Sequence, residues 1–391
     1  MSQLLPSPAP AERLLSLDAF RGFVIVAMIW VNYLAGMPGI PYWLEHTGPH
    51  ADGITLPDIV FPAFLFIVGV AIPLSLHRAV GKVDAALAGR LLWRAGSLMV
   101  AGVVLANVYR YDAQAALLPR AWYTFLFYVA MILLWRQANG RGWPFYGGAA
   151  LMLFLLAAFR GTLNEEFDSV YLQHTWWGIL GMIGWGYLLC SALFLAVRGK
   201  PAALVAALIA LLAVYFIAPA GLLPFVNVPQ VLGSTAANVM AGTVAGTLFV
   251  QRAMPHATRI RWMVILAAAL FAAGLLLRPW GGINKIQATA SYSLVCAAIA
   301  LALFLLFYVT IDVLRIRRWA VVLLPAGANA LFAYIAPDLW EQLAAVLHLP
   351  RFWWPYLESG GAAGLLNAAA MTAAMVALTA LATRTGLRLK F

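Results

Sequence analysis

The chain has 391 residues, of which 64% are hydrophobic and only 10% are charged. Soluble proteins carry about 25% charged residues, so this composition excludes a soluble globular protein and predicts that lipid surrounds most of the chain. The net charge of +11 does not indicate nucleic-acid binding, because the basic residues are scattered at the ends of apolar runs. Cationic loops beside a membrane account for them, and no nucleic-acid partner is expected.

Twelve apolar runs follow one another along the chain, and runs of about 20 residues predict membrane-spanning helices. They cover residues 18–36, 57–77, 90–108, 118–136, 143–159, 174–197, 201–218, 231–250, 260–278, 288–311, 320–341 and 361–383. The fourth and fifth runs are short, so the expected count is ten to twelve. The sequence therefore predicts an all-α, polytopic membrane helix bundle, with residues 1–391 as one integral-membrane domain in a lipid bilayer.

The distribution of Lys and Arg predicts the orientation of these helices. With the N-terminus in the cytoplasm, 19 of the 25 basic residues fall in inner segments. The positive-inside rule therefore favours a cytoplasmic N-terminus, with residues 1–15 as a short cytoplasmic tail and residues 37–56 as a periplasmic loop. Most carboxylates fall on the outer side, which either suits an amino-bearing ligand or only reflects that acidic residues escape this rule.

The first apolar run begins and ends with polar residues. Asp18 and Arg21 are three residues apart, so they share a helix face and can pair. They form a salt-bridged helix entrance, or Arg21 faces an anionic ligand at the inner surface. Asn32 lies about 20 Å further along the helix. Its amide needs a hydrogen-bonding partner in the bilayer, which either a neighbouring helix or a polar cavity can supply.

The loop that follows, "LEHTGPHADGITLPDIVFP", contains His46, His50 and Asp58. Asp58 opens the second run and is either a carboxylate that caps the helix or the partner that orients a histidine. A neutral imidazole beside an amine can act as a general base, or it can attack a thioester and carry the acyl group itself. Two histidines in a Gly/Pro-rich loop are a weak metal signal, and no metal is expected.

A second polar segment, "GGINK", precedes the tenth run and supplies Asn284 and Lys285. Lys285 is one of six basic residues predicted on the outer side. It either extends its ammonium group to the membrane interface or holds a carbonyl or sugar oxygen at a site.

Several of these motifs together resemble the heparan-α-glucosaminide N-acetyltransferase family, especially its bacterial, NagX-like members. They are "SLDAFRG", "VNY", "YWLEHTG" and "DGITLPDIVFPAFLFIVGVAI", with "GGINK" and "GANALFAY" similar to later motifs of the family. The resemblance implies a bacterial inner-membrane acyltransferase of the EC 2.3.1 type. Such an enzyme moves the acetyl group of cytoplasmic acetyl-CoA, its co-substrate, to the amine of glucosamine or a related amino sugar on the periplasmic side.

The resemblance also assigns roles to residues. The catalytic histidine of the family falls on His46, its span-one asparagine on Asn32, the Asp-Val-Phe-Pro aspartate on Asp58 and its Asn-Lys lysine on Lys285. Two departures leave alternatives open. The loop lacks the tryptophan that often follows the histidine, so His50 stays a second candidate base. "LPRAWYTFLFYV" stands where the family has Gly-Val-Leu-Gln-Arg, and there Arg120 is the candidate replacement.

From the motifs and the resemblance together, we expect catalysis by His46, Asn32 and Asp58, and a homodimeric assembly. The expected substrate- or CoA-binding residues are Asp18, Arg21, Asn284, Lys285, Arg120 and His50. Other inner arginines could also attract the CoA phosphates, or they are only the usual positive charge of inner loops: Arg78, Arg90, Arg94, Arg317 and Arg318. Two other functions stay open: an O- or N-acyltransferase for envelope glycans, and an amino-sugar transporter.

Overall fold

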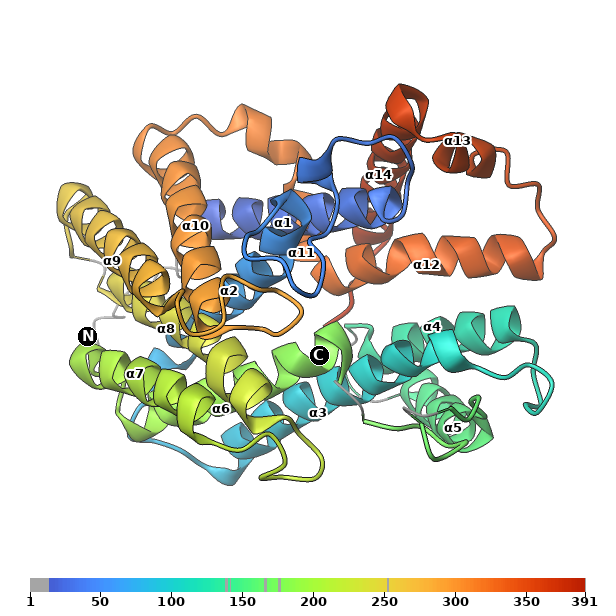
Figure 1. The fold of residues 1–391 in the computed structure, drawn as a ribbon, viewed down its shortest axis with the longest axis horizontal. Helices are drawn as coiled ribbons and strands as arrows, with labels where there is room; N and C mark the ends of the chain where they lie inside the picture. Colours follow the sequence, from blue (N-terminus) through green and yellow to red (C-terminus); the bar gives the residue numbers. More distant parts are fainter. Residues whose placement is uncertain are drawn as a thin grey trace, which may run out of the picture.

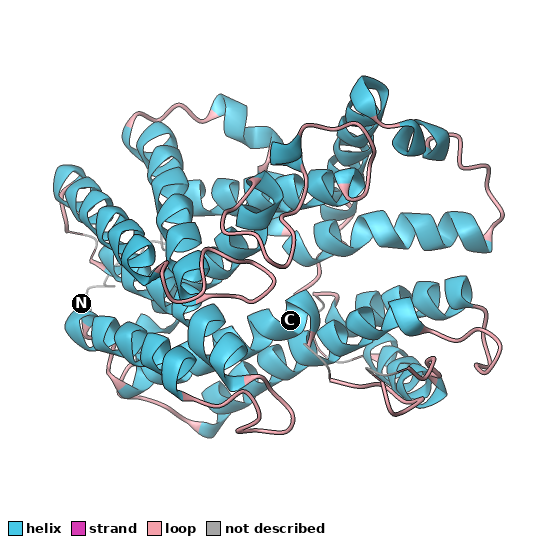
Figure 2. Ribbon diagram, viewed as in Figure 1, coloured by secondary structure: helices cyan, strands magenta, loops and turns pink. Residues whose placement is uncertain are grey.

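The computed structural model describes residues 14–137, 140, 142–164, 167–174, 177–251 and 253–390. Most of the predicted tail at residues 1–15 thus lies outside the described residues. The described residues form helices and loops, and they contain no β-strand (Figure 2). The predicted all-α class is confirmed.

Fourteen α-helices are found in the described part of the chain. They are α1 (Leu15–Leu34), α2 (Leu56–Leu76), α3 (Ala85–Asn107), α4 (Arg120–Trp135), α5 (Trp143–Ala158), α6 (Gly178–Ala196), α7 (Pro201–Ile217), α8 (Ala236–Val250), α9 (His256–Leu277), α10 (Ala290–Tyr308), α11 (Leu324–Ala328), α12 (Ala330–Val346), α13 (Trp354–Ser359) and α14 (Gly361–Arg384). Figure 1 shows α1 and α2 in the middle, with α7 and α9 on one side and α4 and α5 on the other.

Eight helical segments of the described chain are long and apolar enough to cross a membrane, and α4, α5 and α7 are apolar but shorter. The run predicted at 320–341 is not one helix. It is divided at the buried Asn329, whose φ of −128° and ψ of 49° end α11 before α12 begins. The Asn329 side chain instead bonds to the backbone of Leu387 and Leu389 in the C-terminal segment. A total of twelve spans, and the cytoplasmic N-terminus, stay predictions.

Close backbone contact between α2 and α8 forms the centre of the bundle. A Cβ atom on Gly69 would lie 2.0 Å from the carbonyl oxygen of Val239, and one on Gly242 would lie 2.1 Å from that of Phe66. Only glycine permits such an approach, and small residues at helix interfaces are the usual means of packing in membranes. These contacts fix α2, which carries Asp58 at its first turn.

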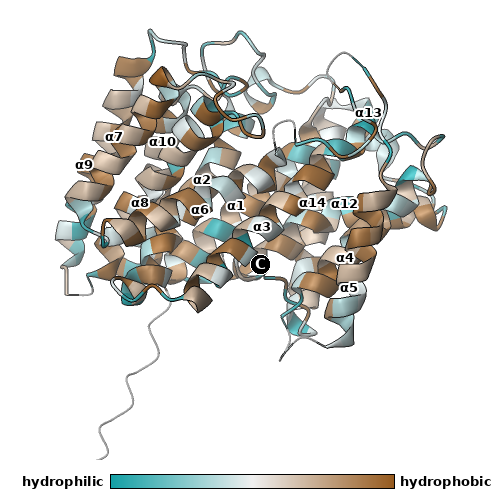
Figure 3. Ribbon diagram, turned by 90° about the horizontal axis from the view of Figure 1, so that it is seen from below, coloured by the Kyte–Doolittle hydropathy of each residue, from teal (hydrophilic) through white to brown (hydrophobic). Residues whose placement is uncertain are grey.

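Loops predicted to lie on the same side of the membrane contact one another. Among the outer loops, the backbone N–H of Gly53 donates to the carbonyl of Ile283 at 3.0 Å, and on the inner side Gln137 donates to Arg388 at 2.7 Å. Figure 3 shows hydrophobic residues along the helices, with polar residues mostly toward their ends and in the loops. This arrangement agrees with two polar rims separated by an apolar belt.

Candidate active site

Asp58 is fully buried at the start of α2 and caps that helix. Its Oδ2 atom accepts a hydrogen bond from the backbone N–H of Thr55 at 3.3 Å, and the Thr55 side chain accepts one from the backbone N–H of Asp58, so the two residues form a capping box. Asp58 Oδ2 also accepts from the N–H and hydroxyl of Thr47, at 3.2 and 2.9 Å. The helix-capping alternative from the sequence is therefore correct, but it accounts for only one of the two carboxylate oxygens.

The other oxygen of Asp58 faces His46 and Lys285. The Nδ1 atom of His46 lies 2.8 Å from Asp58 Oδ1, and the Nζ atom of Lys285 lies 3.2 Å from the same oxygen. Lys285 Nζ also lies 2.7 Å from His46 Nδ1. Three ionisable groups from two distant loops and a helix thus meet at one point, and we call them the His46 cluster.

The His46 cluster cannot make all of its hydrogen bonds in one protonation state. A charged Lys285 has only donors, so Nδ1 would have to accept from it, and the ring would then carry its hydrogen on Nε2. If Lys285 is neutral, Nδ1 can donate to Asp58, and Nε2 becomes a free acceptor. Burial lowers the pKa of Lys285 while the Asp58 carboxylate opposes that shift. We infer that the charge of Lys285 sets which nitrogen of His46 is free to take up a proton.

The loop that carries His46 is tied to the "GGINK" loop. The buried Asn284 donates from Nδ2 to the carbonyls of Pro49 and Ala51, at 2.8 and 2.9 Å. Asp52 accepts from the N–H of Ile283 and from the Arg278 guanidinium, and both bonds hold the pKa of Asp52 below its usual range. Asn284 thus holds the loop that carries His46 and does not line the cavity beside His46.

The backbone conformation of the "GGINK" loop requires its two glycines. Gly281 and Gly282 have φ angles of 121° and 69°, which side chains of other residues rarely adopt. A Cβ on Gly282 would also lie 3.1 Å from the Asp52 carboxylate. The pair therefore allows the loop to turn back against the His46 loop and to present Lys285.

His46, Lys285 and Asn32 line one cavity of about 510 Å³. Most of the other lining is apolar, and Tyr292, whose hydroxyl donates to the backbone carbonyl of Asp58 at 2.6 Å, contributes to it. Neither the Asn32 amide nor Nε2 of His46 has a hydrogen-bond partner within the described part of the chain. Of the two sources of a partner for Asn32 left open by the sequence, the cavity agrees with the structure.

A second cavity of about 390 Å³ adjoins the first, because Met28 and Ile179 line both. Its polar lining includes Arg21, Arg94 and Lys390, which all belong to segments predicted on the inner side. Asp18 pairs with Arg21 at 3.1 Å, as the spacing predicted. We call this space the inner cavity.

The remaining candidates lie elsewhere. His50 lines a separate surface pocket with Asp52 and Arg278, away from the His46 cluster. Arg120, at the first turn of α4, lines a further pocket that also contains Asp338. The structure therefore brings His46, Asp58, Lys285 and Asn32 together, and it leaves His50 and Arg120 outside their cavity.

Sequence reasoning missed three residues around this site. Thr47 carries no signal of its own, because its role depends on how the loop folds over α2. Thr55 could have been found, since Thr-x-x-Asp before an apolar run is a capping signature. Tyr292 lies in an apolar run, and its bond to the Asp58 carbonyl depends on how α10 packs against α2.

Comparisons with known proteins agree with the motifs. A family model described as a domain of unknown function (DUF5009) matches residues 13–119, a range that contains Asn32, His46 and Asp58. The chain is 39% identical over 102 residues to the heparan-alpha-glucosaminide N-acetyltransferase of Mus musculus, and 38% identical over 100 residues to that of Homo sapiens. The alignments cover 25% and 24% of this chain, and the chain spans only 14% of the length of each relative. The resemblance predicted from the motifs is confirmed: about a quarter of this chain is similar to heparan-α-glucosaminide N-acetyltransferases.

Proposed function

We propose that this protein is a membrane acetyltransferase that transfers the acetyl group of acetyl-CoA to the amine of glucosamine or a related amino sugar. The observation that carries the proposal is the His46 cluster, in which Asp58 holds His46 Nδ1 at 2.8 Å and leaves Nε2 for a substrate. A carboxylate–imidazole pair beside a cavity suits proton transfer from an attacking nucleophile. The similarity to N-acetyltransferases supplies the reaction type.

The two adjoining cavities support a route for acetyl-CoA. Arg21, Arg94 and Lys390 can bind the CoA phosphates at the inner cavity, because guanidinium and ammonium groups suit phosphate oxygens. The thin pantetheine arm would then pass Met28 and Ile179, which line both cavities, and bring the thioester to His46. Transfer from a cytoplasmic donor to a periplasmic acceptor in a bacterial inner membrane follows from the predicted orientation.

The chemistry needs one base and one oxyanion donor. The amine nitrogen attacks the acetyl carbonyl carbon while His46 Nε2 accepts a proton from it. The C–S bond then breaks, and the leaving thiolate takes that proton and departs as CoA thiol. Asn32 is placed better than Lys285 to stabilise the oxyanion, because Lys285 lies on the Nδ1 side of the ring. A two-step route through acetyl-His46 uses the same groups.

Proteoliposomes loaded with acetyl-CoA test this function. Glucosamine added outside should become N-acetylglucosamine with the wild-type protein, and His46→Ala should reduce the rate by at least about 100-fold. His50→Ala is the matched comparison from the same loop, and it should keep most of the activity. Folding of each variant is checked by thermal unfolding in detergent.

The same vesicles distinguish the other functions. Accumulation of unmodified glucosamine without acetyl-CoA would identify a transporter, which the adjoining cavities could also serve. Turnover of acetyl-CoA that glucosamine does not stimulate would identify an acyltransferase for envelope glycans. Full transfer to glucosamine by His46→Ala would exclude His46 as base or acyl carrier.

A further inference from the structure

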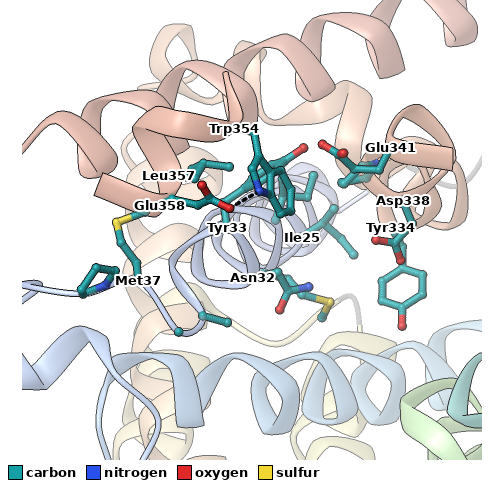
Figure 4. A pocket seen from close by; sticks show the side chains of 16 residues that line it. Ile25, Asn32, Tyr33, Met37, Tyr334, Asp338, Glu341, Trp354, Leu357 and Glu358 are labelled. Atoms are coloured by element: carbon teal, nitrogen blue, oxygen red, sulfur yellow. Dashed lines mark hydrogen bonds between the residues drawn. The ribbon is translucent and has the colours of Figure 1, made fainter. Parts of the chain in front are cut away.

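A further cavity of about 470 Å³ shares Met28 with both cavities above and Asn32 with the cavity beside His46. Residues of α1, α12, α13 and the loop after α1 line it (Figure 4). Three carboxylates, Asp338, Glu341 and Glu358, belong to its lining, and the described lining residues include no Lys, Arg or His. Glu341 and Glu358 therefore give the cavity an excess of negative charge.

Neutral groups orient these carboxylates without cancelling their charge. Glu341 accepts a hydrogen bond from Trp353 Nε1 at 3.0 Å, and Glu358 accepts one from Trp354 Nε1 at 2.6 Å. The nearest recorded cation is Arg351, whose Nε atom is 3.9 Å from Glu341, and the Arg351 side chain is 39% exposed. A long, exposed pair of this kind is weak. The negative charge of the cavity is thus available to bind a cationic ligand.

Asp338 follows the same pattern deeper in the bundle. Its Oδ2 atom accepts from the hydroxyl of the buried Tyr128 at 3.0 Å. Tyr33, Tyr334 and Trp354 add aromatic surface to the lining. Carboxylates beside aromatic faces suit a ligand that has both an ammonium group and a ring with an apolar side, because cations bind aromatic faces as well as carboxylates.

Asn32 connects this cavity to the His46 cluster. Its side chain lines both cavities, and Figure 4 shows it among the residues of the acidic one. An amino sugar bound here could therefore give up one ammonium proton to a carboxylate and then pass Asn32 with its neutral amine to reach the thioester. The lining also includes Met37 and Pro38 from the loop predicted on the outer side, where such an acceptor would arrive.

We propose that this acidic cavity is the acceptor site and binds an amino sugar through its ammonium group. The inference rests on the proposed acetyl transfer for its catalytic meaning, but the binding of an amino sugar can be measured without it. No residue of the His46 cluster lines this cavity, and Met28 and Asn32 line both this cavity and the one beside His46.

The test compares Glu341→Gln, Glu358→Gln and the double variant with the wild type. Gln keeps the shape and can still accept from the tryptophan N–H groups, so folding should be preserved. In the transfer assay, the KM for glucosamine should rise about tenfold in the double variant, as expected for the loss of charge-assisted hydrogen bonds. The KM for acetyl-CoA should not change. Asp112→Asn, a carboxylate in the loop between α3 and α4, is the matched control and should leave both constants unchanged.

Calorimetric titration of the purified protein separates this inference from the proposed function. Wild type should bind glucosamine and should not bind glucose, which has the same ring without the amine, and the double variant should lose the difference. Trp354→Phe, which keeps an aromatic ring but removes the N–H bond to Glu358, should weaken glucosamine binding less than the double variant does. Equal glucosamine binding by the double variant and the wild type would overturn the acceptor site, even if transfer itself is observed. Absence of transfer with intact, charge-dependent binding would overturn the function and keep the site.

Discussion

A single nitrogen atom, His46 Nδ1, determines how this site can work. It lies within hydrogen-bonding distance of the Asp58 carboxylate and of the Lys285 amine. It can donate a hydrogen bond to Asp58 or accept one from Lys285, but it cannot do both. We therefore propose that Lys285 sets the tautomer of His46 rather than stabilising an oxyanion, the role that such a group has in other acyl transfers. This gives Lys285 a role that its charge alone does not suggest.

The pH dependence of Lys285→Met tests that role. Burial lowers the pKa of Lys285 below its ordinary value of 10.5. As the pH rises through this lowered pKa, the wild-type lysine loses its proton, Nδ1 donates to Asp58, and Nε2 becomes a base. The wild-type rate should therefore rise in the alkaline range. Lys285→Met should keep activity near neutrality and lack this rise, because Nδ1 then donates to Asp58 at every pH at which the ring is neutral.

The acceptor amine also titrates, but it contributes the same rise to both proteins, so the comparison uses the ratio of their rates at each pH. A ratio that is low and constant across the range would contradict the tautomer role and favour oxyanion stabilisation by Lys285. Lys285→Arg serves as the matched control, since a guanidinium stays charged throughout and should keep the rate low at high pH.

At the scale of elements, the site depends on two loops that hold each other. Asn284 makes two hydrogen bonds to the His46 loop and is buried, so its replacement by Ala leaves two carbonyls without their donor. We expect Asn284→Ala to reduce the free energy of unfolding by about 1–3 kcal/mol. It should also lower kcat more than it raises KM for acetyl-CoA, because the imidazole would be held less firmly.

Thermal unfolding and steady-state kinetics check this expectation. Gln287→Ala is the control on the same loop, because Gln287 is exposed and its Nε2 is 3.5 Å from the Pro49 carbonyl, at the limit of a hydrogen bond. A normal kcat in a destabilised Asn284→Ala protein would show that the hydrogen bonds from Asn284 to the His46 loop support folding without positioning His46.

Helices could be predicted from the sequence where a long run of apolar residues was present. Residues 18–36 and 57–77 coincide with α1 and α2, because a stretch that must satisfy every backbone group in lipid has to be helical. The break between α11 and α12 at Asn329 could not be predicted. The Asn329 side chain bonds to the backbone of the C-terminal segment, and the sequence does not show that this segment lies beside it. The π-helical turn at Val228–Thr235 that leads into α8 has no sequence signature either.

Part of the candidate site could likewise be predicted from the sequence, and part of it could not. His46 and Asp58 lie in one continuous motif, so the sequence could suggest their pairing. The hydrogen bonds from Asn284 to the His46 loop could not be predicted, and neither could the acidic cavity. In both cases the residues come from segments more than 200 positions apart. Contacts of that kind depend on how the helices assemble, which apolar patterns do not specify.

The whole molecule places basic groups at one end of the adjoining cavities and the His46 cluster at the other. Arg94 lines the inner cavity and lies over the ring of Tyr187, with its Cζ 4.6 Å from the ring centroid. Arg94→Gln should therefore raise the KM for acetyl-CoA about tenfold without changing the KM for glucosamine. Added salt should raise the wild-type KM for acetyl-CoA, and it should do so less in the variant.

Arg90→Gln is the matched control, since Arg90 is on the same helix and is exposed outside the inner cavity. Equal KM values for acetyl-CoA in the Arg94 and Arg90 variants would contradict nucleotide binding at the inner cavity. An effect of Arg94→Gln on glucosamine instead would indicate that the cavities have been assigned to the wrong substrates.

Met28 is the one residue of α1 that borders the inner cavity, the His46 cavity and the acidic cavity at once. A catalyst that joins reactants from opposite compartments must remain tight to ions while an acyl group goes through. An unbranched thioether with three rotatable bonds can move aside for a slim thioester and return afterwards. If the proposed transfer takes place, we expect Met28, which has no part in the chemistry, to form the barrier against proton leakage.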